Sequence, residues 1–193
     1  MKQWKNFTGM VSVIEGLSNM KTIFLEIDGV LNNITSNAMG GILNRSNTDV
    51  IKIAASTIAE PSIQQLNRLF ESVQNMWIVL TSSWRNQIDI KEVRQILFIS
   101  GFNFSHRVFD ITPFKPNNKP GQVCNWLREH AVESETNSFV ILDSKYIMGL
   151  LENFSVKTDP DIGLTKQNVD IMINGFRHQE YRLAKIWHLI EKK

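Results

Sequence analysis

Short runs of apolar and β-branched residues recur along the chain and predict the strands of a buried sheet. Three of these runs are too short for a helix and are typical of strands buried on both faces: 22–25, 76–80 and 139–142. The stretch 108–113 predicts a further short strand that leads into a turn at Pro113. The chain therefore contains at least part of a parallel sheet, since continuous apolar runs are the usual pattern of parallel strands.

Apolar residues at helical spacing lie between these runs. One helix is expected over 62–74, with Pro61 in or near its first turn, because five apolar residues recur there at intervals of three and four: Ile63, Leu66, Leu69, Phe70 and Val73. Further helices are expected at 88–97, after a loop over 115–121, and at 166–174, where Thr165 suits the N-cap. Residues 49–59 fit a helix or a strand equally.

The last segment, 177–193, has the pattern of a basic amphipathic helix. Its apolar positions include Tyr181, Ile186, Trp187 and Ile190. We expect this helix to pack on the domain, and the alternative is that it binds a protein partner.

Strands that alternate with helices predict an α/β fold, a three-layer sandwich with a mainly parallel central sheet. We divide the chain into an N-terminal extension (1–20), one domain (21–176) and the C-terminal helix (177–193). Residues 32–49 are rich in Asn, Ser, Thr and Gly and predict an irregular loop. The interval before the next strand is too short for a large cap domain, so an open site is expected.

Composition narrows the function classes. Hydrophobic residues make up 42% of the chain and charged residues 21%, and the net charge of +2 is too small to indicate a nucleic-acid surface. No apolar run reaches the ~20 residues of a membrane helix, and polar residues interrupt 11–17, so neither a membrane span nor a signal peptide is expected. The lone Cys124 excludes an internal disulfide and favours a cytoplasmic location.

Two acids follow the first buried strand. Glu26 and Asp28 are two residues apart, so they lie on the same side of an extended chain, and Gly29 allows a sharp turn next to them. Carboxylate oxygens at a strand end suit a hard cation such as Mg²⁺. A solvated strand end is the alternative for this pair taken alone.

Hydroxyl groups follow the second buried strand, in the stretch Thr81-Ser82-Ser83-Trp84-Arg85. At the carboxyl end of a parallel strand, Thr81 and Ser82 would face the crevice where α/β sheets bind ligands, and they can donate to a phosphate. The alternative is that they cap the next helix. Arg85 is a candidate second phosphate ligand, or a residue that pairs with a surface acid. Asp143 follows the apolar run 139–142, and Lys119 lies in the predicted loop over 115–121. With Glu26, Asp28 and Thr81, they all fall at strand ends or in adjoining loops, which predicts one site at one edge of the sheet.

The stretch from Lys21 to Asn32 resembles motif I of the haloacid dehalogenase (HAD) superfamily, with Glu26 in place of the nucleophilic Asp. The stretch 78–85 and the phrase Thr-Asp-Pro…Gly-Leu-Thr at 158–165 are similar to the HAD domains associated with RNA-repair (Swiss Army Knife) proteins. The resemblance covers most of the chain, from about Lys21 to Ile173. It implies a Rossmann-like α/β fold.

The resemblance also implies roles for individual residues. Lys119 stands where the family has its motif III base, four residues after its rival Lys115. Asp143 stands at motif IV, where Ser144 replaces a second acid and Lys145 is near. The implied catalytic residues are Glu26, Asp28, Thr81 and Lys119, the implied phosphate ligands are Thr81, Ser82, Arg85 and Lys119, and the implied Mg²⁺ ligands are Glu26, Asp28 and Asp143.

Two functions follow from the resemblance. The first is a Mg²⁺-dependent phosphohydrolase acting on a phosphorylated small molecule, a nucleotide or a nucleic-acid end. Its activity would be weakened by Glu26, since a nucleophile misplaced by ~1 Å costs on the order of 10²-fold in rate. The second is a catalytically inactive HAD-like module that keeps the pocket for binding or scaffolding, which the replacements at Glu26 and Ser144 favour.

Overall fold

A parallel sheet forms the centre of the computed structural model, which describes residues 20–33, 50–113, 115, 118–130, 136–145 and 148–190. Its strand order is β3-β2-β1-β4-β5, and each neighbouring pair is parallel. The strands span Met20–Leu25 (β1), Met76–Leu80 (β2), Val108–Ile111 (β3), Thr136–Asp143 (β4) and Ser155–Lys157 (β5). The predicted three-layer α/β fold is therefore confirmed.

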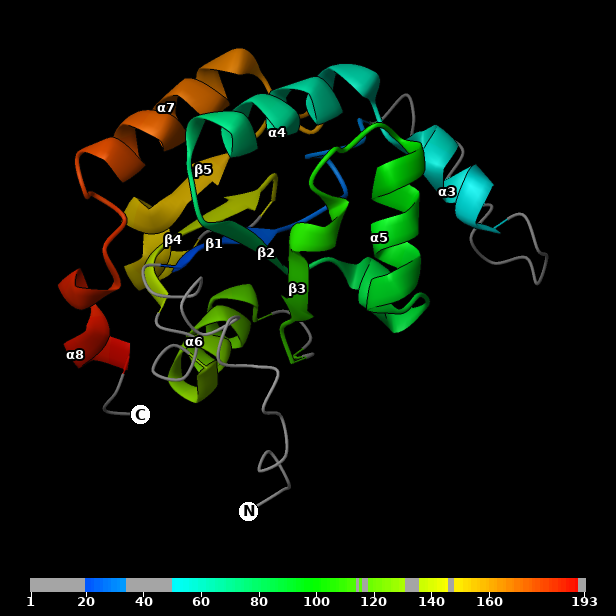
Figure 1. The fold of residues 1–193 in the computed structure, drawn as a ribbon. Coiled ribbons are helices and arrows are strands. Elements are labelled where there is room, and N and C mark those ends of the chain that lie inside the picture. Colours follow the sequence, from blue (N-terminus) through cyan, green and yellow to red (C-terminus); the bar gives the residue numbers. More distant parts are fainter. Residues whose placement is uncertain are drawn as a thin grey trace, which may run out of the picture.

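Helices cover both faces of this sheet. α4 and α7 lie along one face and α6 along the other (Figure 1). The helices are α3 (Val50–Thr57), α4 (Glu60–Ser72), α5 (Ile90–Ile99), α6 (Lys119–His130), α7 (Lys166–Arg177) and α8 (Trp187–Ile190), and the 3₁₀ turns are η2 (Ser83–Asn86), η3 (Ser105–Arg107), η4 (Gly149–Phe154) and η5 (Leu183–Lys185). None of the described helices is long and apolar enough to cross a membrane.

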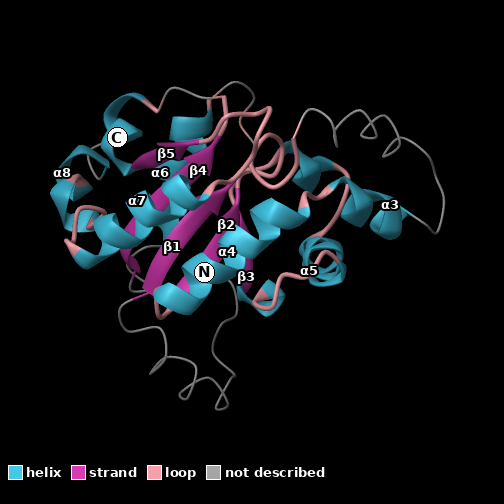
Figure 2. Ribbon diagram, turned by 90° about the horizontal axis from the view of Figure 1, so that it is seen from above, coloured by secondary structure: helices cyan, strands magenta, loops and turns pink. Residues whose placement is uncertain are grey.

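The chain reverses its direction of travel across the sheet between β3 and β4. It runs outward from β1 to β2 and β3, and then returns to add β4 and β5 on the other side of β1. In such sheets the crevice at the carboxyl ends of the two central strands is the usual ligand site. Figure 2 shows loops gathered at this end of the strands.

Aromatic packing fixes α6 beneath β1 and β4. The ring of Phe24 in β1 makes edge-to-face contacts with Trp126 of α6 at 5.3 Å and with Phe139 of β4 at 5.8 Å. The indole N–H of Trp126 donates to Asp110 Oδ2 at 2.6 Å. Trp126 is fully buried, so this contact sets the height and rotation of the helix that begins at Lys119.

The start of α6 differs from the expected loop over 115–121. The helix begins at Lys119, because Asn118 Oδ1 accepts a hydrogen bond from the N–H of Gly121 at 2.9 Å and Pro120 needs no N–H donor in the first turn. Residues 50–57 form a helix, which resolves the ambiguity there. The short edge strand β5 was not predicted. Residues 34–49, most of the predicted loop, lie outside the described residues, as do 1–19 of the predicted extension.

Residues 177–190 do not form the single amphipathic helix that the sequence predicts. α7 continues to Arg177, Gln179 then adopts a φ of 57°, and only the short α8 follows. The reason is an alternative partner for the backbone, since Phe139 N–H donates to Tyr181 O at 2.9 Å at the end of the sheet. The ring of Tyr181 packs against Phe176, and burial raises the pKa of its hydroxyl to about 12.

We predict that Gly175→Ala destabilises the protein although alanine is the better helix former by about 1 kcal/mol. Gly175 lies in α7, and a Cβ at this position would collide with the ring of Tyr181. The free energy of unfolding in urea should fall by roughly 1–2 kcal/mol, as in overpacked cores. In a Tyr181→Ala background the same change should be neutral or stabilising. Stabilisation by Gly175→Ala alone would contradict the observed packing.

Candidate active site

Strand register brings three of the predicted site residues to one level. Leu25 of β1 lies beside Leu80 of β2 and beside Leu142 of β4. All three strands are parallel, so their next residues emerge together at the carboxyl edge of the sheet: Glu26, Thr81 and Asp143.

Lys119 enters this edge from α6 and joins the three strand ends. Its Nζ lies 2.5 Å from Glu26 Oε2 and 3.3 Å from Asp143 Oδ2, and it donates to Thr81 O at 2.7 Å. All three charged residues are buried: Lys119 is 4% exposed, Glu26 8% and Asp143 3%. The ammonium is therefore a buried cation between two carboxylates. Lys115, the rival base, has an exposed side chain.

Arg85 holds the first turn of α6 in place. Its Nη1 donates to Thr112 Oγ1 and its Nη2 to Gln122 Oε1, both at 2.8 Å, and Gln122 Nε2 donates to Lys115 O at 2.5 Å. This network links the end of β3 to the helix that carries Lys119. The expected contact of Arg85 with phosphate stays a prediction, and the contacts observed here are structural.

Both oxygens of the Glu26 carboxylate have partners within the protein. Oε2 accepts from Lys119, and Oε1 accepts from the N–H of Ile27 at 3.0 Å. The extra methylene of glutamate, relative to aspartate, lets the carboxylate fold back to the next amide of its own chain. The candidate nucleophile is therefore held by neighbouring donors on both sides.

The turn after β1 is fixed by side chains from other elements. Asp28 Oδ1 accepts from Asn32 Nδ2 and from Trp84 Nε1, each at 3.0 Å, and Ser144 Oγ donates to Asp28 O at 3.0 Å. Gly29 has a φ of 77°, and a Cβ there would collide with Ser144 Oγ. The predicted requirement for glycine thus comes from both the backbone and this close approach.

The two predicted hydroxyl donors have different environments. Ser82 Oγ accepts from the N–H of Trp84 at 3.3 Å, so it caps η2, as the alternative interpretation of this stretch anticipates. The hydroxyl of Thr81 is buried and has no hydrogen-bond partner among the described residues. A buried hydroxyl without a partner is costly, which makes Thr81 the better candidate to meet a ligand oxygen.

The Mg²⁺ site that the resemblance implies stays a prediction. Among the described residues, no three acidic, histidine or cysteine side chains are grouped to hold a metal ion. Magnesium commonly takes one or two carboxylates and completes its shell with water and substrate phosphate. Glu26, Asp143 and the main-chain carbonyl of Asp28 stay the predicted ligands of such an ion, and the two carboxylates now contact Lys119. Lys145, whose charge would oppose a cation, has an exposed side chain and its N–H donates to Asp143 Oδ1 at 2.9 Å.

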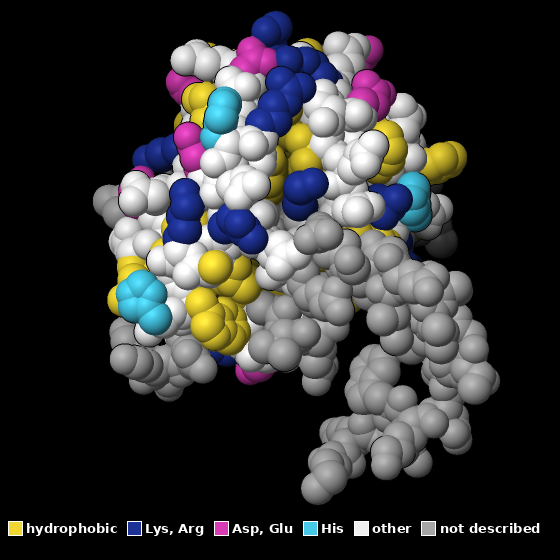
Figure 3. All heavy atoms as spheres, turned by 60° about the vertical axis from the view of Figure 1, so that its left-hand side comes forward, with side chains coloured by type: hydrophobic (Ala, Val, Ile, Leu, Met, Phe, Trp, Pro, Cys, Tyr) yellow, Lys and Arg dark blue, Asp and Glu magenta, His cyan; other side chains and the backbone are white. Residues whose placement is uncertain are grey.

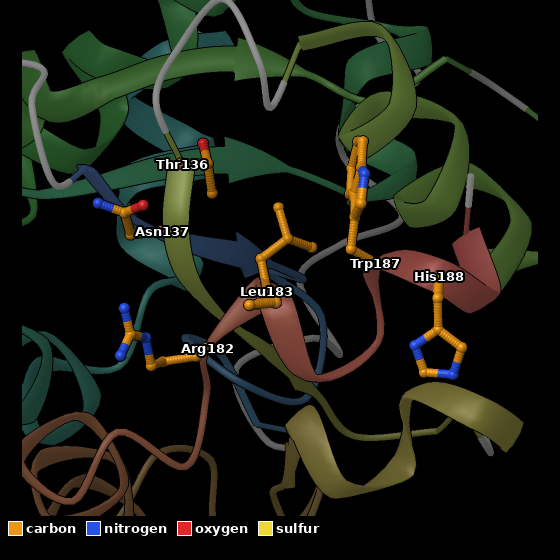
Figure 4. A pocket seen from close by; sticks show the side chains of 7 residues that line it. Thr136, Asn137, Arg182, Leu183, Trp187 and His188 are labelled. Carbon is orange, nitrogen blue, oxygen red and sulfur yellow. The ribbon is translucent and has the colours of Figure 1, made fainter.

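A separate hollow of about 380 Å³ lies at the other end of β4. It is lined by seven residues: Thr136, Asn137, Arg182, Leu183, Ala184, Trp187 and His188. In Figure 4 the side chains of Arg182 and His188 point away from Trp187, so they do not converge on a ligand. Thr136 begins β4 and Asp143 ends it, which separates this hollow from the candidate active site.

Trp84 and Asn32 are the two site residues to which the sequence assigned no role. Trp84 stands in the motif that carries the resemblance, and Asn32 is four residues after Asp28, a spacing that allows a hydrogen bond across a tight turn. Only the fold shows that both donate to the same carboxylate oxygen.

We predict that Lys119→Met lowers the free energy of unfolding by about 3–5 kcal/mol, because it leaves Glu26 and Asp143 buried without their shared cation. The exposed control Lys115→Met should stay within about 0.5 kcal/mol of the native protein. Adding Glu26→Gln to Lys119→Met should recover part of the loss. Equal urea midpoints for the two lysine variants would contradict the buried cluster.

Comparison with known families gives one match. The model of the HAD domain in Swiss Army Knife RNA repair proteins matches residues 22–169. No curated protein and no solved structure matches the chain. The match covers most of the chain, including β2 to β5, all of β1 from Thr22 onward and every candidate site residue. The chain therefore belongs to the family of HAD domains found in Swiss Army Knife RNA repair proteins.

Proposed function

We propose that this protein is a Mg²⁺-dependent phosphohydrolase of low turnover that acts on a phosphate monoester, such as a nucleotide or a nucleic-acid end. The observation that carries the proposal is the meeting of Glu26, Thr81, Lys119 and Asp143 at one carboxyl edge, with Asp28 on the adjoining turn. The family name places such domains in RNA repair proteins. That context favours a phosphorylated nucleic-acid end over other esters.

The charge of the site explains why a cation is needed. Two carboxylates, Glu26 and Asp143, flank the ammonium of Lys119, and a third, Asp28, lies on the adjoining turn, so a phosphate dianion would be repelled by the excess negative charge. HAD domains generally use Mg²⁺, and when bound it would neutralise this charge and polarise the phosphoryl oxygens. Glu26, Asp143 and Asp28 O would hold it.

The protein groups then divide the reaction between them. The carboxylate of Glu26 attacks phosphorus and forms an acyl-phosphate, while the bond from phosphorus to the ester oxygen breaks and Asp28 gives that oxygen a proton. Asp28 next takes a proton from water, which attacks the acyl-phosphate, releases inorganic phosphate and restores Glu26. Lys119 and Thr81 stabilise the phosphoryl oxygens through charge and a hydrogen bond.

The surface around α7 gives little support for binding a long nucleic acid there. On the face at the left of Figure 1, Lys and Arg side chains are spread among uncharged and acidic ones, as Figure 3 shows. The proposal therefore concerns recognition of a phosphorylated end at the carboxyl edge. A cytoplasmic location and a protein partner for the C-terminal segment are also proposals, resting on the lone Cys124 and the exposed Leu189.

A specific observation favours the second candidate, an inactive module that binds or scaffolds. To attack phosphorus, one oxygen of Glu26 must give up its present partner, which is Lys119 for Oε2 and the N–H of Ile27 for Oε1. Each charge-assisted bond of this kind contributes roughly 1.5–3 kcal/mol. That cost raises the barrier, and it explains why low turnover is part of the proposal.

We predict that the native protein hydrolyses a phosphate monoester slowly with Mg²⁺ and that Glu26→Asp raises kcat on the order of 10²-fold. The shorter side chain cannot fold back to Ile27 N–H in the same way, so it returns the carboxylate to the position that the family uses. Asp28→Asn should abolish turnover in both backgrounds. Release of inorganic phosphate measures all four proteins.

The control is Glu71→Asp, the same chemical change at an exposed position of α4. It should leave the rate unchanged. Absence of phosphate release from both the native protein and Glu26→Asp, with the fold intact, would contradict the phosphohydrolase and support the inactive module.

A further inference from the structure

Trp84 is placed to orient the carboxylate of Asp28. Its indole Nε1–H donates to Asp28 Oδ1 at 3.0 Å across 56 positions of sequence, and the side chain is only 6% exposed. The backbone of Trp84 is itself fixed, because its N–H donates to Ser82 Oγ and its carbonyl accepts from Gln87 and Ile88. The indole therefore presents its N–H in one direction.

Asn32 donates to the same oxygen from the opposite end of the turn. Its Nδ2 lies 3.0 Å from Asp28 Oδ1, and its own Oδ1 accepts from the N–H of Gly29 at 2.8 Å. Asn32 is fully buried, so its orientation is set by this turn. Among the described residues, both hydrogen bonds to the Asp28 carboxylate go to Oδ1.

Two N–H donors on one carboxylate oxygen decide where a proton can be carried. A proton on Oδ1 would face both N–H groups and break at least one hydrogen bond, whereas a proton on Oδ2 leaves both intact. Proton transfer needs the reacting atoms within hydrogen-bond reach, so the orientation of Oδ2 determines how well Asp28 serves a leaving group. An unconstrained carboxylate would offer either oxygen in many orientations.

We propose that Trp84 and Asn32 are positioning residues that make Oδ2 the proton-carrying atom of Asp28, which suits the site to phosphate monoesters of aliphatic alcohols. This inference rests on the proposed phosphohydrolase function. An alkoxide is a poor leaving group and must be protonated as the bond to phosphorus breaks. A nitrophenolate leaves without a proton, so its ester gains little from a well-oriented acid.

The experiment compares Trp84→Phe with the native protein on an alkyl phosphate and on p-nitrophenyl phosphate. Phenylalanine keeps a buried six-membered ring and removes the N–H donor together with the rest of the five-membered ring, a loss of volume that the control variant below shares. We expect the rate of alcohol release from the alkyl ester, measured in a single turnover with the protein in excess, to fall on the order of 10²-fold, the usual size of a general-acid contribution. The single-turnover rate of p-nitrophenolate release should change little, because the later attack of water, which Asp28 also assists, is common to both esters and lies outside this measurement.

Trp77→Phe is the matched control. The Nε1 of Trp77 in β2 has no hydrogen-bond partner among the described residues, so this variant removes an indole N–H without touching Asp28. It should leave both rates unchanged. Equal losses of the two single-turnover rates in Trp84→Phe, or no loss of either, would overturn the positioning role.

A second readout separates this inference from the proposed function. If the native protein hydrolyses neither ester, the proposed phosphohydrolase function is contradicted. The contact of Trp84 with Asp28 can still be tested by NMR. The indole ¹⁵N–H resonance of Trp84 is assigned as the one that disappears in Trp84→Phe, and it is then followed in Asp28→Ala. A resonance that moves upfield and exchanges faster with solvent supports the positioning contact. A resonance that does not move overturns it.

Discussion

The buried ammonium of Lys119 is the interaction on which the site depends. It meets the ends of three strands at once, through Glu26 after β1, Thr81 O after β2 and Asp143 at the end of β4. Removing two carboxylates and an ammonium from water is costly, and only close contacts among them offset that cost. The sheet must therefore hold its strand ends in register, and α6 must deliver the lysine at the correct height.

The contacts that stabilise the unliganded site oppose the proposed attack of Glu26 on phosphorus. The contacts that satisfy Glu26 within the fold are the same ones that a nucleophile must give up, and a phosphate must compete with two carboxylates for Lys119. Under the proposed function, such well-paired groups stabilise the site without substrate and slow the reaction when substrate is bound. The extra methylene of Glu26 shifts the balance toward stability, since it allows both carboxylate oxygens to find donors inside the protein.

The sequence was sufficient for the fold because strands and helices have different periods. The apolar runs 22–25, 76–80 and 139–142 lie within strands, and Thr165 caps α7 as predicted. The prediction of one C-terminal helix was wrong because apolar periodicity contains no information about the hydrogen bond from Phe139 N–H to Tyr181 O. Local sequence patterns predict the helices and strands, whereas long-range hydrogen bonds determine where a marginally stable helix ends.

The same distinction holds within the candidate site. Glu26, Asp28 and Lys119 could be named from motifs, whereas the donation of Trp84 to Asp28 joins two motifs that sequence treats separately. Ser144 illustrates this best. In the sequence it is a missing acid, but in the fold its hydroxyl donates to Asp28 O and packs so closely on Gly29 that no Cβ fits there. An acid at this position would lose that donor when ionised and would add a further negative charge beside the turn that carries Asp28. Serine at position 144 therefore fixes the orientation of the turn that carries Asp28, whereas an acid there would supply a possible cation ligand.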